Sequence, residues 1–105
     1  MQKTYLTGVV RTKRVDLADG QTEVVLLDAD KATIAVAPGA GGTITVDFTG
    51  SAGEHIAAGD ALWNAAAGLG AGGVVSASVL DTIPSALTAV RVTAQGAPGR
   101  VEVTQ

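Results

Sequence analysis

The C-terminal residues alternate apolar and polar side chains in two runs, 87–95 and 100–105, separated by the Gly- and Pro-containing segment 96–99. Alternation with period two is typical of a β-strand with one buried face. If the intervening segment forms a hairpin loop, Val92 pairs with Val103, and both strands direct their valines to the same side. The pattern predicts a half-buried antiparallel sheet.

Similar signals recur along the chain. Residues 43–49 alternate cleanly, and the breaker at 38–42 predicts a second hairpin that joins them to the run 32–37. Further strands are predicted at residues 5–10, 22–28 and 74–80, with a polar connection at 11–20 and a bend at 81–86. Short strands separated by Gly- and Pro-containing turns are typical of a β-sandwich or jelly roll.

The region between residues 50 and 73 is the least strand-like. Residues 60–67 fit a short helix with Asp60 as N-cap and Gly68 past its end, and an irregular edge strand fits them nearly as well. The chain, residues 1–105, is therefore predicted to be one all-β domain, an antiparallel sandwich or jelly roll of about seven to eight strands with at most one short helix. The predicted core residues are Ile44, Val46, Phe48, Val75, Val79, Val90, Val92, Val101 and Val103.

Composition limits the bulk of this core. Hydrophobic residues make up 47% of the 105 residues, but nineteen of them are alanine, and Phe, Trp, Tyr and Met occur once each. A thin core would gain stability from burial against a partner, so we expect a homo-oligomer or a bound partner. The absence of cysteine excludes disulfides and thiolate metal sites. No apolar run suggests a signal peptide or a membrane span, so the expectation is a soluble chain with no membrane partner.

Charge is unevenly distributed. The net charge of −3 argues against general nucleic-acid binding, yet four of the seven cations fall within the first fourteen residues, where there is no acid. One interpretation is a solvated first strand and turn. The other is that residues 1–14 form a basic docking segment for an acidic partner surface. The cations concerned are Lys3, Arg11, Lys13 and Arg14.

No motif points to catalysis or to a cofactor. The glycine-rich segment 68–73 matches G-x-G-x-x-G, but it lacks the preceding strand and following helix that a dinucleotide site needs. His55 is the only histidine, and no serine occurs in a nucleophile-elbow context. Asp28 and Asp30 could share a cation, although their spacing is also that of an ordinary turn, which we favour. The sequence therefore predicts no enzyme, no cofactor and no metal.

Trp63 is the aromatic residue of most interest. A single tryptophan in an alanine-rich segment either fills the end of a small sandwich or anchors an interface. Both interpretations remain open at this point, and the second makes Trp63 a candidate partner-binding residue.

Four segments together resemble small β-sandwich structural proteins of tailed-bacteriophage virions, some of which are capsid decoration or cement proteins. The segments are GTITVDF at 42–48, GDALW at 59–63, IPSALTAVRVTA at 83–94 and VEVTQ at 101–105. The resemblance covers roughly residues 42–105 and transfers no catalytic residue.

The resemblance implies a non-enzymatic virion protein that is made in the bacterial cytoplasm and binds the outer surface of the phage capsid. Its partner would be the major capsid protein or another virion protein. The alternative is a receptor- or glycan-binding β-sandwich module of a phage tail or cell surface. For a sugar, only Trp63 with Asp60 and Asn64 offers an aromatic beside polar side chains.

Overall fold

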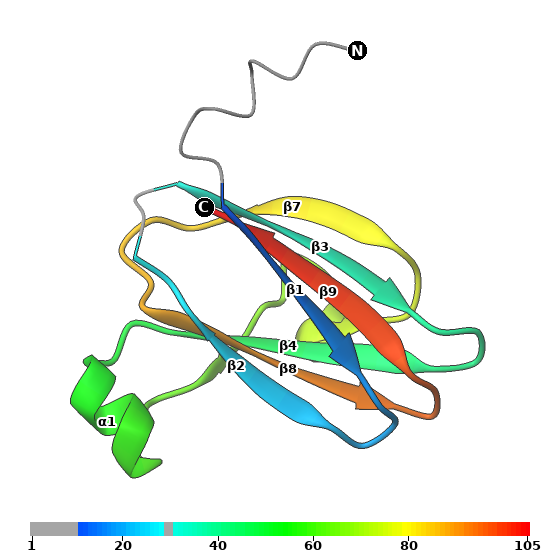
Figure 1. The fold of residues 1–105 in the computed structure, drawn as a ribbon, viewed down its shortest axis with the longest axis horizontal. Helices are drawn as coiled ribbons and strands as arrows, with labels where there is room; N and C mark the ends of the chain where they lie inside the picture. Colours follow the sequence, from blue (N-terminus) through cyan, green and yellow to red (C-terminus); the bar gives the residue numbers. More distant parts are fainter. Residues whose placement is uncertain (1–10, 29–30) are drawn as a thin grey trace, which may run out of the picture.

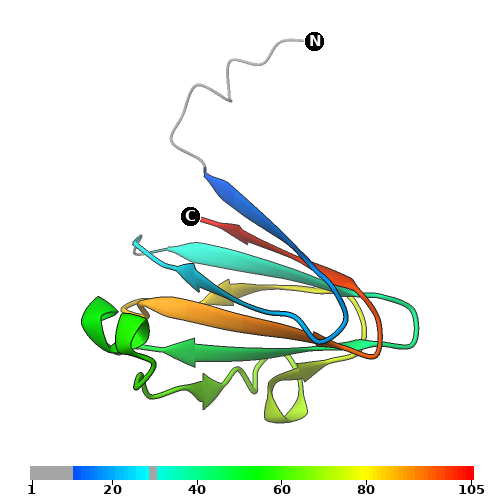
Figure 2. The ribbon, with the colours of Figure 1, turned by 60° about the horizontal axis from the view of Figure 1, so that its bottom comes forward.

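The computed structural model describes residues 11–28 and 31–105 of the chain. Within these residues, nine strands form two antiparallel sheets packed as layers, and one short helix lies at one end (Figures 1 and 2). Sheet A has the order β1 (Thr12–Leu17), β9 (Gly99–Thr104), β3 (Ala32–Pro38) and β7 (Val79–Ile83). Sheet B has the order β2 (Thr22–Leu26), β8 (Ala89–Gln95), β4 (Thr43–Thr49) and β5 (Asn64–Ala65), and β6 (Val74–Val75) also pairs with β4. The predicted all-β sandwich is confirmed.

The chain crosses between the sheets at most of its connections. β1 and β2, β3 and β4, and β8 and β9 are consecutive strands that lie in opposite sheets. The two strand orders, β1-β9-β3-β7 and β2-β8-β4-β5, therefore correspond position by position, which is the order of a jelly roll. The three tight connections between these strand pairs lie together at one end of the sandwich (Figure 1, right).

Both predicted hairpins are wrong. The runs 87–95 and 100–105 contain β8 and β9, but β8 pairs with β2 and β4, whereas β9 pairs with β1 and β3. The runs 32–37 and 43–49, which contain β3 and β4, are divided between the sheets in the same way. Alternation is identical in a hairpin and in a connection between facing sheets, because each strand directs every second side chain to the core in both cases. The strands were located correctly, and their pairing was not.

Two predicted connections contain strands. The stretch 11–20 includes β1, whose Val15 and Leu17 alternate with polar residues and are buried. The predicted strand 74–80 and bend 81–86 are replaced by the two-residue β6 and by β7, which continues to Ile83.

The helix lies earlier in the chain than predicted. Helix α1 spans Gly53–Ala58, and Gly59 ends it with a φ of 81° in the left-handed region that glycine adopts without strain. Residues 60–67 contain β5 at the edge of sheet B, so the irregular edge strand was the better interpretation. The predicted strand at residues 5–10 lies outside the described residues.

The core lies between the two sheets. Seven of the nine predicted core residues are buried, and Phe48 and Val79 are partly buried against the same cluster. β1 and β3 supply further buried side chains from sheet A. The seven are Ile44, Val46, Val75, Val90, Val92, Val101 and Val103.

Candidate functional site

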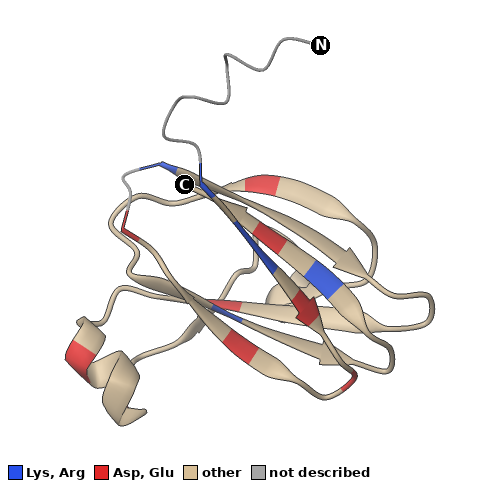
Figure 3. Ribbon diagram, in the orientation of Figure 1, with Lys and Arg blue, Asp and Glu red and all other residues tan. Residues whose placement is uncertain are grey.

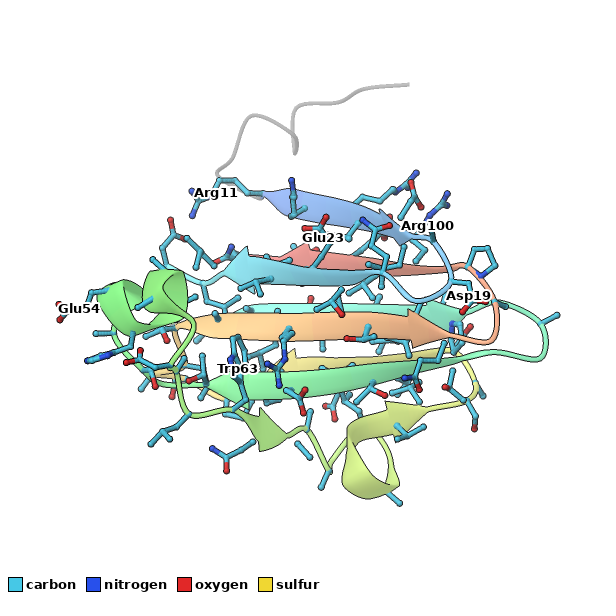
Figure 4. All side chains as sticks on the ribbon, turned by 90° about the horizontal axis from the view of Figure 1, so that it is seen from below. Arg11, Asp19, Glu23, Glu54, Trp63 and Arg100 are labelled. Carbon is cyan, nitrogen blue, oxygen red and sulfur yellow. The ribbon has the colours of Figure 1, made fainter. Side chains whose placement is uncertain are left out.

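Trp63 lies half-buried against the outer face of sheet B, beside β8 and β4 and near α1 (Figure 4). The guanidinium carbon of Arg91 is 4.5 Å from the centroid of its ring, within the range of a cation–π interaction. Nη2 of Arg91, on β8, donates to Oδ2 of Asp47, on β4, at 3.1 Å. Arg91 and Asp47 are direct neighbours in the register of the two strands, so the sheet itself positions the cation at the ring.

The segment that carries Trp63 covers one end of this outer face. Alternation along β4 and β8 directs Thr49 and Ala89 outward, yet their exposed fractions are only 1% and 0%. The Thr49 hydroxyl donates to the carbonyl of Leu62 at 2.7 Å, and the Leu62 N–H donates to Oγ of Ser51 at 3.0 Å. These bonds anchor the backbone at Leu62, and the Arg91 contact restrains the Trp63 ring. Such restraint before a partner binds reduces the entropy cost of association.

Exposed apolar side chains lie on the same side of the molecule. Leu62 is 78% exposed and adjoins Trp63, and Leu26 on β2 is 62% exposed. Val24, also exposed, is the register partner of Arg91 on the other side of β8. Aromatic and arginine side chains beside apolar area are the composition of interface hot spots. We call this surface the sheet B patch, and it consists of Val24, Leu26, Leu62, Trp63 and Arg91.

The cations of the predicted docking segment do not form one cluster in the part of the chain that the structure describes. Arg11 donates to Asp28 at 2.7 Å and so joins the start of β1 to the end of β2. Arg14 pairs at 2.7 Å with a carboxylate of β9 on the outer face of sheet A. Lys13 makes no ion pair with any described residue. Lys3 lies outside the described residues.

The other candidate residues have local partners. His55 lies on α1 with Nδ1 3.1 Å from Oδ1 of Asp60, and both side chains are exposed. The Asp28 carboxylate accepts from Arg11, and Asp30 lies outside the described residues. The glycine-rich segment 68–73 contains a short 3₁₀ turn between β5 and β6. Among residues 11–28 and 31–105, no group of three or more His, Cys, Asp or Glu side chains is placed to hold a metal ion.

Sequence reasoning found Trp63 but missed its partners. Alternation already places Asp47 and Arg91 on the polar face of their strands. Their contact depends on β4 and β8 being neighbours in sheet B, and the hairpin prediction instead gave β8 the wrong neighbour.

Comparisons of the chain with protein-family models, with curated proteins and with solved structures found no match. In the part of the chain that the structure describes, no helix has the length and apolar character needed to cross a membrane.

Proposed function

We propose that this chain is a non-enzymatic virion protein that binds the outer surface of a phage capsid through the sheet B patch and stabilises the shell. The observation that carries the binding role is Trp63, which lies half-buried with Arg91 over its ring and follows exposed Leu62 in the chain. Tryptophan and arginine contribute disproportionately to binding energy when a partner excludes water around them.

The identity of the partner rests on the resemblance of residues 42–105 to decoration proteins. The jelly-roll order of the strands supports it only by analogy, since viral capsid domains and lectins share this architecture. The thin, alanine-rich core supports it physically, because burial of the exposed leucines against a shell would add apolar area that the core lacks.

Glycan binding is the alternative from a different class. Stacking of a sugar needs an accessible aromatic face. Arg91 occupies one face of the Trp63 ring, and Asp60 is engaged by His55. A sugar could therefore use only one face of the Trp63 ring and would have to compete with His55 for Asp60. For this reason we favour a protein surface as the partner.

The test is co-sedimentation of the purified protein with expanded, DNA-free shells of a tailed phage that encodes this chain. We expect Leu62→Asp to lower shell affinity at least tenfold, because it places a charge beside Trp63 at an exposed position that folding tolerates. Leu62→Met and Ser76→Asp are the controls, the first conserving the apolar contact and the second adding the same charge at another exposed site. Trp63, the only tryptophan, should also shift its fluorescence to shorter wavelength when shells are added.

Wild-type protein that stays in the supernatant with shells but is retained on a glycan array would replace the proposal with the alternative. Equal shell affinity of Leu62→Asp and Ser76→Asp would move the binding surface away from the sheet B patch.

A further inference from the structure

The outer face of sheet A carries four charged side chains in a two-by-two array on β1 and β9. Arg14 is the register partner of Glu102, and Asp16 is the register partner of Arg100. Each register pair forms one row of the array. In the first row the β1 side chain is positive and the β9 side chain negative, and in the second row the signs are reversed, as the blue and red bands of the two strands show (Figure 3). We call it the charge array of sheet A.

Each row is held by a short ion pair. Nε of Arg14 donates to Oε2 of Glu102 at 2.7 Å, and Nε of Arg100 donates to Oδ1 of Asp16 at 2.6 Å. The hydrogen bond and negative charge of Asp16 raise the pKa of Arg100 above its ordinary value. All four side chains remain accessible, with exposed fractions between 33% and 65%.

The other side chains in these two rows are small or apolar. Ala35 and Leu80 continue the first row across β3 and β7, and Ala37 continues the second. The alanines form the floor of a shallow depression of about 540 Å³, which Ser78 and Leu80 border on one side and the two arginines on the other. Leu80 is 71% exposed, although it belongs to a strand of the sandwich.

The sheet edges are unsuited to association by strand pairing. Alternation directs one charged residue on each of three edge strands toward the interior side: Lys13 on β1, Glu23 on β2 and Asp81 on β7. Inward-pointing charges on edge strands oppose edge-to-edge pairing, because a strand added there would bury them. A second copy is therefore better accommodated on a face than at an edge.

We propose that the outer face of sheet A is a homodimer interface, in which a two-fold axis runs across the strands midway between the two rows of the charge array. Rotation about this axis exchanges the rows. Arg14 of one copy then lies over Asp16 of the other, and Glu102 lies over Arg100, so every charge faces its opposite. A two-fold interface requires such a self-complementary surface.

The same two-fold axis also brings complementary uncharged side chains of the two copies together. Ala35 of one copy lies over Ala37 of the other, and Leu80 lies over the hollow beside Ser78, where the residues are small. The strands of the two copies remain aligned, as in packed sheets about 10 Å apart. Four strands of five to seven residues cover roughly 20 Å by 20 Å, which is a small interface, so we expect a dissociation constant on the order of 10–100 µM.

Sedimentation velocity of the isolated protein over a concentration range of about 5 to 500 µM tests the dimer. The variant Arg14→Glu with Arg100→Glu makes the array entirely negative, and Asp16→Lys with Glu102→Lys makes it entirely positive. Each should be monomeric, and an equimolar mixture of the two should restore a dimer at least as tight as that of the wild type. The control Glu23→Lys with Glu54→Lys raises the net charge by the same amount as the all-positive variant, but on β2 and α1, and should dimerise like the wild type.

Circular dichroism establishes that each variant is folded. For the wild type alone, dilution in a ¹⁵N-labelled sample should shift amide resonances of β1, β9, β3 and β7 and leave those of β8 and β4 unchanged. A wild type that is monomeric at 500 µM and low salt, or a mixture that stays monomeric, overturns the proposal. Neither experiment includes phage shells, so a negative result would overturn the dimer and leave the proposed capsid binding untouched.

Discussion

Val92 illustrates how strictly the interior of this small sandwich is defined at the level of a single residue. It is completely buried in β8, opposite Val46 of β4 on one side and Glu23 of β2 on the other. Its chain neighbour Thr93 points outward, and the Thr93 and Thr22 hydroxyls are 2.8 Å apart on the outer face. One step along the strand therefore moves a side chain from the core to the outer face of sheet B.

We expect Val92→Asp to prevent folding. An unpaired buried carboxylate costs several kcal/mol, against a total stability of about 5 to 10 kcal/mol for a domain of this size. Thr93→Asp is the matched control, and it should lower stability by at most about 1 kcal/mol, because the carboxylate there stays in contact with water and can accept from the Thr22 hydroxyl. Far-ultraviolet circular dichroism and thermal melting compare the two, and similar melting curves for both variants would contradict the assignment of the faces.

The connections that join the two sheets pack closely against one another at one end of the sandwich. A Cβ atom added to Gly42 would lie 2.8 Å from the Cβ of Ala97, which belongs to the β8–β9 connection. The Gly96 N–H, in that connection, donates to Oδ1 of Asp19 between β1 and β2 at 2.8 Å. Glycine is thus required at position 42 for close approach of two connections between facing sheets.

Gly42→Ala should destabilise the fold by about 1 to 3 kcal/mol, because overpacking forces the neighbouring connection to move. Gly53→Ala should stabilise it by up to about 1 kcal/mol, since a Cβ there would have no atom within 4 Å and alanine favours the helix α1. Urea unfolding of both variants gives the two free energies of unfolding. Equal effects of the two substitutions would show that the connections are not closely packed.

The inward-pointing edge charges lead to a second prediction at this scale. Glu23→Val turns β2 into the run Thr-Val-Val-Val-Leu at a sheet edge, and we expect it to aggregate at concentrations at which the wild type stays in solution. Thr22→Val adds an apolar side chain to the same strand but leaves the edge charge in place, and it should not aggregate. Light scattering during incubation distinguishes them, and aggregation of both would assign the effect to added hydrophobicity alone.

At the scale of the whole molecule, the two outer faces differ in character. The outer face of sheet B presents Trp63 and exposed leucines, whereas that of sheet A presents compensated charges. A protein with two unlike faces can bind its partner with one and a second copy with the other. Of the basic residues at the start of the described chain, Arg14 belongs to the outer face of sheet A, whereas Arg11 pairs with Asp28 and Lys13 lies opposite buried Val103.

The variant Lys3→Ala, Arg11→Ala, Lys13→Ala tests whether these cations contribute to capsid attachment while leaving the charge array intact. Exposed charges contribute about 0.2 to 1 kcal/mol each, so shell affinity should fall by roughly three- to a hundredfold at low salt. The difference should largely disappear at high salt, where the screening length falls to about 3 Å. Shell affinities that match the wild type at both salt concentrations would support the other interpretation, in which these residues are solvated and bind no partner.

Part of the candidate site could be predicted from the sequence. Trp63 stood out as a single tryptophan in an alanine-rich segment, and alternation placed Asp47 and Arg91 on a polar face. The stacking of Arg91 on Trp63 joins residues 28 positions apart, and the charge array joins β1 to β9 across most of the chain. No local pattern encodes these contacts, because they depend on which strands become neighbours.

Alternation along the chain predicted the fold class, most strand positions and most of the residues that face the core, because burial of one side of a strand imposes period two on its side chains. The division of β8 and β9, like that of β3 and β4, between opposite sheets follows from tertiary packing. A strand that turns back within its sheet and one that crosses to the facing sheet direct the same residues inward. Alternation therefore cannot distinguish them, and only the packing of the two complete layers selects the jelly-roll order and the outer faces that it creates.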